Sequence, residues 1–93
     1  MKVQKIKKGN EEMLKEIEKI INGTTARIVW EFNTVLADKK IVWIVYEKDD
    51  IYFEIAFKYL LKKAEKKINY YTSAYLEFKD CELWIMTPSQ YGE

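Results

Sequence analysis

The sequence predicts an α+β fold, a two-layer sandwich in which two helices cover one face of a four-stranded antiparallel sheet. Two segments have apolar residues at helical spacing, and four others show the alternation or the continuous apolar run that is typical of strands. The length of 93 residues corresponds to a single α+β domain, residues 1–93. The expected order of the elements along the chain is therefore α-β-β-α-β-β.

The first predicted helix begins near Asn10, a favourable N-cap, and ends at Gly23. Its apolar side is formed by Met13, Leu14, Ile17, Ile20 and Ile21. A basic N-terminal segment, residues 1–9, precedes this helix. If residues 2–7 add a strand, the sheet has five strands and the order β-α-β-β-α-β approaches a ferredoxin-like fold.

The next two elements are predicted to be strands that form a hairpin with a polar tip at residues 37–40. The first strand carries its apolar residues at alternate positions, Ala26, Ile28, Trp30 and Phe32, which predicts one apolar face. The second strand contains the run IVWIVY, residues 41–46. Because successive side chains point to opposite faces, this strand needs apolar surroundings on both sides of the sheet.

The second half of the chain repeats the pattern of a helix followed by two strands. Asp49 and Asp50 offer a helix cap, and the second predicted helix runs from Ile51 to about Ile68. Alternation returns over residues 69–79, and the segment CELWIM, residues 81–86, is the last predicted strand. Residues 88–93 are expected to be a C-terminal tail.

With both helices on one face, the second face of the sheet is expected to be open and rich in aromatic side chains. Strand alternation assigns to it Arg27, Val29, Glu31, Tyr71, Tyr75, Glu77, Glu82, Trp84 and Met86, with either Trp43 and Val45 or Ile44 and Tyr46. Contiguous apolar surface of this kind usually marks a partner site.

We therefore predict that the chain forms a homodimer or binds a different protein through this face. The predicted interface residues are Val29, Trp43, Val45, Tyr71, Tyr75, Trp84 and Met86. Most small oligomers are two-fold dimers in which one patch contacts its own copy. The alternative is that a terminal segment or a folded-over hairpin of the same chain covers the open face.

The residue types limit the chemistry of the chain. The absence of histidine excludes an imidazole base, a Ser-His or Cys-His pair and any histidine-containing metal site. Cys81 is the only cysteine, which excludes an intrachain disulfide, and its position on the core-facing side of a strand predicts an inert thiol. No catalytic residue, metal site, cofactor or small-molecule substrate is predicted, and the chain is expected not to be an enzyme.

A carboxylate-dependent metal enzyme is a minor alternative. It would require adjacent strands to bring four glutamates of the open face together, and these are Glu31, Glu47, Glu77 and Glu82.

Nucleic-acid binding is the stronger alternative, although it is not favoured. Some RNA-binding domains stack bases on tyrosine and tryptophan of an open sheet. Here the net charge is only +1, and the glutamates of the open face have the wrong sign for phosphate. The better basic surface is the lysine-rich part of the second predicted helix, residues 58–67, with Lys58, Lys62 and Lys66 as candidate contacts.

The favoured function is that of a small binding protein without enzymatic activity. Inhibitors, immunity proteins and accessory proteins of viruses or mobile elements are built in this way, an analogy at the level of protein class. No apolar run reaches the roughly 18 residues of a membrane span, and the N-terminus lacks a secretory signal, so we expect a cytoplasmic protein. The abundance of Lys, Glu, Ile and Tyr resembles the usage of heat-adapted proteins.

Overall fold

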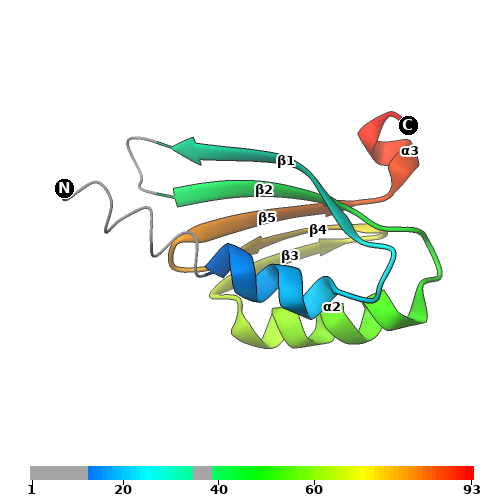
Figure 1. Ribbon diagram of the computed structural model, residues 1–93, viewed down its shortest axis with the longest axis horizontal. Helices are drawn as coiled ribbons and strands as arrows, with labels where there is room; N and C mark the ends of the chain where they lie inside the picture. Colours follow the sequence, from blue (N-terminus) through cyan, green and yellow to red (C-terminus); the bar gives the residue numbers. More distant parts are fainter. Residues whose placement is uncertain (1–12, 35–38) are drawn as a thin grey trace.

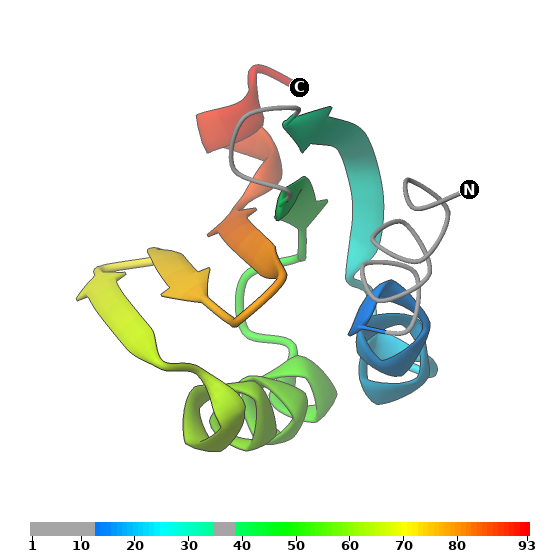
Figure 2. The same cartoon turned by 90° about the vertical axis from the view of Figure 1, so that its left-hand side faces the viewer.

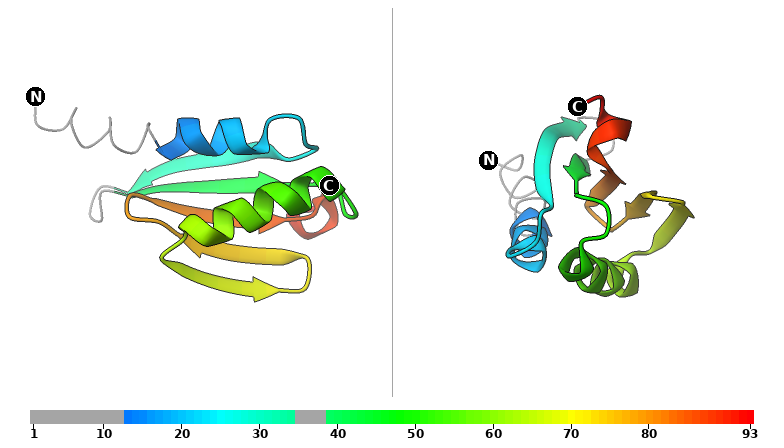
Figure 3. Two further views of the ribbon diagram at one scale, coloured as in Figure 1. Left: turned by 90° about the horizontal axis from the view of Figure 1, so that it is seen from below. Right: turned by 90° about the vertical axis from the view of Figure 1, so that its right-hand side faces the viewer.

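The computed structural model describes residues 13–34 and 39–93, and it has two main layers. The upper layer in Figure 1 is a five-stranded sheet. Beneath it lie the first helix, described over residues 13–21, and α2 (Ile51–Lys63). These two helices lie side by side and cover one face of the sheet (Figure 3). A third, short helix, α3 (Pro88–Tyr91), lies on the opposite face.

The sheet is mixed. Its strands are β1 (Arg27–Thr34), β2 (Lys39–Val45), β3 (Lys66–Tyr70), β4 (Ser73–Glu77) and β5 (Cys81–Met86). They are arranged in the order β1-β2-β5-β4-β3. β2 and β5 pair in parallel at the centre, whereas the other three pairs are antiparallel.

The predicted α+β sandwich is confirmed at this level, but the prediction of an antiparallel sheet is wrong at its centre. The chain leaves β2, crosses through α2 and the β3–β4 hairpin, and returns beside β2 in the same direction, as parallel neighbours require. The fifth strand appears because the single strand predicted over residues 69–79 is a hairpin. Its first part belongs to β3, which begins at Lys66 within the predicted helix, and a turn at residues 71–72 leads into β4. The proposed strand over residues 2–7 lies outside the described residues.

The hydrophobic core lies between the sheet and the two large helices. The central strands and the helices contribute side chains that are at most 3% exposed, namely Ile17, Val42, Ile44, Phe53, Leu60, Leu83 and Ile85. Val42 is in register with Leu83, and Ile44 with Ile85. The helix-facing positions of IVWIVY are therefore 42 and 44, which leaves Trp43 and Val45 on the other face.

Helix α2 begins where the sequence predicts. Asp50 is its N-cap, and the Asp50 carboxylate accepts hydrogen bonds from the backbone N–H groups of Tyr52 and Phe53. The same carboxylate accepts hydrogen bonds from the backbone N–H and the hydroxyl of Thr25, which joins α2 to the segment before β1. These hydrogen bonds to Thr25, together with those in the cap, lower the pKa of Asp50.

The end of α2 differs from the prediction. The helix stops at Lys63, and Lys66–Tyr70 forms the strand β3, whereas the sequence predicted a helix to about Ile68. Ile68 continues the helical spacing of the apolar residues in α2, but it pairs with Tyr75 across the β3–β4 hairpin. Tyr71 makes the turn with a φ of 56°. Pairing across this hairpin therefore outweighs the local helical pattern.

A β-bulge divides β1 into two parts. Ile28 is opposite Ile44, but the next pair is Trp30 with Trp43, so Val29 is an extra residue on β1. The bulge reverses the alternation, because Trp30 and Phe32 now share a face with Trp43 and not with Ile28. The prediction of one apolar face on this strand, Ala26 to Phe32, is therefore wrong after Ile28.

The last residues form α3, where the sequence predicted a tail. The Tyr91 ring packs edge-on against the Trp43 ring, with 6.3 Å between their centroids, and Val45 is only 1% exposed. Arg27 of β1 pairs with Glu93 just after the helix. A terminal segment of the same chain thus covers part of the second face of β2, although it leaves much of β3, β4 and β5 open.

The alternation along β5 gives a test of this arrangement. We expect Leu83→Glu to lower the free energy of unfolding by at least about 3 kcal/mol, because the carboxylate would be buried without a partner beneath α2. Trp84→Glu should leave the fold intact, because Trp84 points to the open face and is already 42% exposed. Circular dichroism during denaturant unfolding compares the two variants. Unfolding by Trp84→Glu and tolerance of Leu83→Glu would contradict the assignment of faces.

Candidate functional site on the open sheet face

All three tryptophans of the chain lie on the open face of the sheet, in one row that crosses the strands. The row begins with Trp30 of β1, which is opposite Trp43 of β2, which in turn is opposite Trp84 of β5. It continues through Tyr75 of β4 to Ile68 of β3. Five strands thus contribute one large side chain each to a single transverse row.

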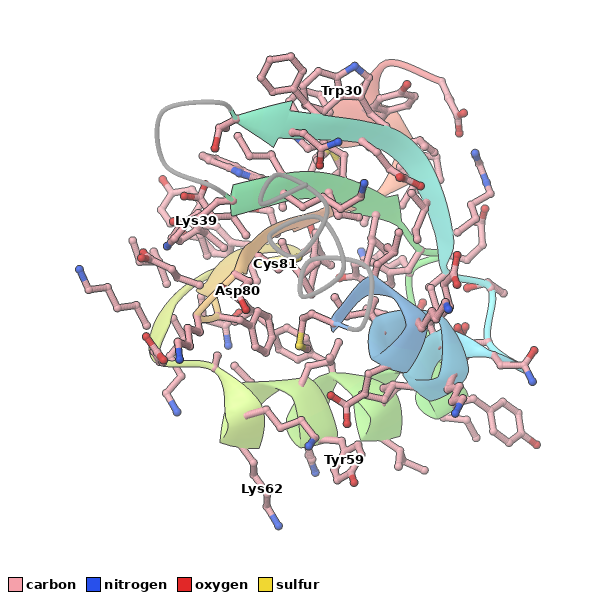
Figure 4. The ribbon with its side chains drawn as sticks, turned by 60° about the vertical axis from the view of Figure 1, so that its left-hand side comes forward. Trp30, Lys39, Tyr59, Lys62, Asp80 and Cys81 are labelled. Carbon is pink, nitrogen blue, oxygen red and sulfur yellow. The ribbon has the colours of Figure 1, made fainter. Side chains whose placement is uncertain are left out.

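We call this surface the aromatic face and define it by the strand residues that share the side of the row. They are Arg27, Trp30, Phe32, Thr34, Lys39, Ile41, Trp43, Val45, Lys66, Ile68, Tyr70, Ser73, Tyr75, Glu77, Glu82, Trp84 and Met86. Figure 4 shows Trp30 on the side of the sheet away from α2, whose Tyr59 and Lys62 point in the opposite direction.

The part of the aromatic face over β1 and β2 is raised. The rings of Trp30 and Phe32 are stacked 5.6 Å apart and remain 43% and 51% exposed. The Trp30 ring also contacts that of Trp43 at 5.2 Å, and α3 stands beside it with Tyr91 against Trp43. Figure 2, which looks along the strands, shows α3 on one side of the sheet and the two larger helices on the other. These contacts make the raised half a continuous aromatic cluster.

The part over β5, β4 and β3 contains a hollow of about 540 Å³. Its walls are Ile68, Tyr70, Ser73, Ala74, Tyr75, Trp84, Ile85, Met86 and Gln90. Gln90 belongs to α3, so the hollow begins at the border of the raised half. Two of these residues, Tyr75 and Trp84, form an edge-to-face pair with 4.9 Å between the ring centroids. The hollow is predominantly apolar, and Ile68 and Tyr70 are well exposed at its edge.

The charges of the aromatic face are largely paired. The Lys39 ammonium lies 2.6 Å from the Glu77 carboxylate, which also accepts a hydrogen bond from the Tyr75 hydroxyl at 3.1 Å. The hydrogen bond from Lys39 lowers the pKa of Glu77, and the bond to Glu77 raises the pKa of Lys39. Lys66 is in register with Glu77. The row of charges at this end of the face is thus close to neutral.

Most of the interface residues predicted from the sequence lie on the aromatic face. Trp43, Val45, Tyr75, Trp84 and Met86 are on it, and the choice between Trp43 with Val45 and Ile44 with Tyr46 is settled in favour of the first pair. Tyr46 instead stacks on Phe53 of α2 and donates a hydrogen bond to the carbonyl of Thr72.

Two predicted residues have other positions. Val29 is the extra residue of the bulge, and Tyr71 lies in the β3–β4 turn, where it is 93% exposed. Sequence reasoning also missed the four large, well-exposed apolar side chains of the face other than Trp84, namely Trp30, Phe32, Ile68 and Tyr70.

One signal in the sequence pointed to the bulge. Lys40 has the same parity as Val42 and Ile44, so its side chain faces the helix layer, where it is nearly buried. A buried ammonium needs a carboxylate, and the bulge turns Glu31 to this side, with Glu31 Oε1 3.2 Å from Lys40 Nζ. Without the bulge, Phe32 would be opposite Lys40 and Glu31 would lie on the open face.

The structure separates the candidate residues of the two alternative functions. Lys58 and Lys62 belong to α2, while Lys66 belongs to β3, where it is in register with Glu77 on the open face, so the predicted lysine stripe over residues 58–67 is not formed. Glu31 faces away from Glu77 and Glu82, which disperses the proposed metal cluster. Within residues 13–34 and 39–93, no three acidic or cysteine side chains are grouped as metal ligands.

Cys81 is fully buried at the start of β5, on the helix-facing side. Burial raises the pKa of its thiol to about 12. The thiolate that a nucleophile requires is therefore strongly disfavoured near neutral pH.

A second groove of about 660 Å³ lies between the first helix and α2. Its walls include exposed apolar residues of α2, such as Tyr52, Ile55 and Tyr59, but also the polar side chains Glu16, Lys19 and Asn22. Among the residues that the structure describes, the tyrosines of this groove, Tyr52 and Tyr59, form no ring pair with each other. Ile55 is 68% exposed on this side of the molecule.

Comparisons with protein-family models, with curated proteins and with solved structures found no match to this chain. In the part of the chain that the structure describes, no helix has both the length and the apolar character needed to cross a membrane. The candidate function therefore rests on the geometry of the aromatic face.

The surroundings of Tyr75 predict an unusual titration. Burial, followed by the hydrogen bond to Glu77, raises the pKa of Tyr75 to about 12. Because the folded state holds this proton more tightly, the stabilisation is complete below about pH 10 and is lost as the pH rises through about 12. Burial also raises the pKa of Tyr46, so absorbance titration should show a late phenolate signal that Tyr75→Phe reduces by one tyrosine and that Glu77→Gln shifts in part to lower pH. An unchanged late signal in Tyr75→Phe would contradict this assignment.

Proposed function

We propose that this chain is a small non-enzymatic binding protein that holds a protein surface, either a second copy or a different protein, against its aromatic face. The observation that carries the proposal is the register of Trp30, Trp43 and Trp84 in one exposed row. Tryptophan and tyrosine dominate the energetics of protein interfaces, where they act as buried anchors within a less important rim.

The cost of leaving this row in water supports the proposal. Trp30 and Trp84 each expose more than two fifths of a side chain that could bury 150–250 Å². At roughly 25 cal/mol per Å², covering one such exposed portion is worth on the order of 2 kcal/mol before the costs of association. Tyr91 of helix α3 contacts Trp43, and Val45 is 1% exposed, yet the outer tryptophans of the row, Trp30 and Trp84, remain more than two fifths exposed.

The charges favour a protein partner over nucleic acid. A nucleic-acid site on this face would need unpaired cations near the stacking rings. Arg27 is paired with Glu93 and Lys39 with Glu77, Lys66 lies opposite Glu77, and Glu82 adds a negative charge two residues before Trp84 on β5. An apolar protein surface with few charges fits such a face better than a polyanion.

Two matched variants test the proposed function. We expect wild-type protein either to self-associate at micromolar concentration or, if monomeric, to bind an apolar fluorescent dye. Trp84→Glu should abolish the association or the dye signal, because a carboxylate at the middle of the row must be desolvated on contact. Ile55→Glu, which places the same charge at an exposed apolar position on the helix layer, should leave both unchanged. Sedimentation equilibrium and dye fluorescence are the measurements.

The opposite pattern would overturn the proposal. A monomer that binds no dye would show that the chain covers its own sheet face. Loss of association in Ile55→Glu but not in Trp84→Glu would move the binding surface to the groove between the helices.

Nucleic-acid binding has one observation in its favour, the group of lysines on the outer side of α2 that includes Lys58 and Lys62. We expect short single-stranded RNA to bind weakly and to lose affinity steeply with added salt, since these lysines contact only phosphate. Lys58→Glu with Lys62→Glu should remove the binding, whereas Tyr75→Phe should not change it. Filter binding across a salt series measures both. Tight, salt-resistant binding that depends on Tyr75 or Trp84 would instead favour base stacking on the aromatic face.

A further inference from the structure

The two halves of the aromatic face have complementary relief. Over β1 and β2 the face is raised by α3 and by the stacked rings of Trp30 and Phe32. Over β5, β4 and β3 it contains the apolar hollow of about 540 Å³. A raised half and a hollow half therefore lie side by side on the aromatic face.

The strand order places β5 at the centre of the sheet, with two strands on either side. A two-fold axis along β5, in the plane of contact, would exchange the two sides of the sheet. The raised half of one copy would then meet the hollow half of the other, and the same contact would occur twice. An axis across the strands would instead set raised half against raised half and hollow against hollow.

The large exposed side chains supply enough surface for such a contact. Six of them, each 36–67% exposed, are Trp30, Phe32, Ile68, Tyr70, Trp84 and Tyr91. At 150–250 Å² for a large side chain, they present on the order of 600 Å² per copy. A standard interface buries about 800 Å² per partner, so the rim around these side chains needs to add only a modest area.

The charges are also compatible with a second copy. Along the row that starts at Lys66, the residues in register are Glu77, Glu82, Ile41 and Phe32. Lys39 pairs with Glu77 in the same region. The axis along β5 sets Glu82 opposite Glu82 of the second copy. Lys39, which lies close to both Glu77 and Glu82, and Lys66 bring positive charge to the same end of the face, so this end of the contact stays close to neutral although like charges meet on the axis.

We infer that the partner of the aromatic face is a second copy of this chain, held as a two-fold dimer in which α3 and the Trp30–Phe32 stack of each copy enter the hollow of the other. This inference rests on the proposed function and specifies its partner. In this arrangement Trp84 lies on the axis and meets Trp84 of the second copy. Phe32 of one copy faces Lys66 of the other, because both belong to the same transverse row.

The first part of the test measures mass by sedimentation equilibrium at micromolar concentration. Wild-type protein should be dimeric. Trp84→Glu, Phe32→Glu on the raised half and Tyr70→Glu in the hollow should each weaken the dimer at least about tenfold, while Ile55→Glu should not. Circular dichroism of each variant separates loss of association from loss of fold.

The second part tests the position of the axis by cross-linking. Phe32→Cys and Lys66→Cys proteins are mixed and treated with a short bis-maleimide that spans the roughly 10 Å between packed sheets. The mixture should give cross-linked dimers in which the two different variants are joined, and neither variant alone should react efficiently. Cys81 should contribute little, because it is fully buried and its pKa is raised to about 12.

The outcomes separate the inference from the proposed function. A monomer whose dye binding is lost in Trp84→Glu would overturn the dimer and leave the face as a site for a different protein. A dimer that cross-links Phe32→Cys to itself would overturn the axis along β5. A monomer without dye binding, or a dimer broken only by Ile55→Glu, would overturn both proposals.

Discussion

The parallel pairing of β2 with β5 is the contact on which the rest of the molecule depends. It joins the N-terminal hairpin, β1 and β2, to the C-terminal meander, β3 to β5, in one sheet. On the helix side it sets Val42 against Leu83 and Ile44 against Ile85, which form the middle of the core. On the other side it sets Trp43 against Trp84. The same register thus supplies both the apolar layer that α2 covers and the aromatic row that no large helix covers.

The bulge in β1 connects the burial of the Lys40 ammonium with the presence of Trp30 and Phe32 on the open face. Lys40 is drawn to the helix side by the parity of the apolar run after it, and its ammonium requires Glu31 nearby. One extra residue in β1 meets this requirement and, as a consequence, turns Trp30 and Phe32 outward beside Trp43. The exposed aromatic cluster is therefore partly the result of satisfying a buried charge elsewhere on the strand.

Helix α3 gives the open face its uneven relief. Its capping interactions around Thr87, with Pro88 at the first position, fix a short turn of helix directly after β5. That turn packs Tyr91 against Trp43 of β2 and leaves the hollow lined by Tyr75, Trp84 and Met86 open beside it. A surface that is half filled and half hollow is suited to a partner of the same shape, which is the physical basis for proposing a second copy.

The sequence by itself determined the features that depend on local chemistry: the Asp50 cap, the strands at IVWIVY and CELWIM, the inert position of Cys81, and an aromatic second face that includes Trp43, Tyr75 and Trp84. Only the tertiary structure decided the features that depend on pairing between distant segments. The end of α2 and the existence of β3 followed from pairing of Ile68 with Tyr75, because the same residues fit both a helical stripe and a hairpin. The parallel centre of the sheet depends on the register of β2 with β5, and the bulge after Ile28 depends on the need of Lys40 for Glu31. Hydrophobic periodicity along one segment carries no information about either contact.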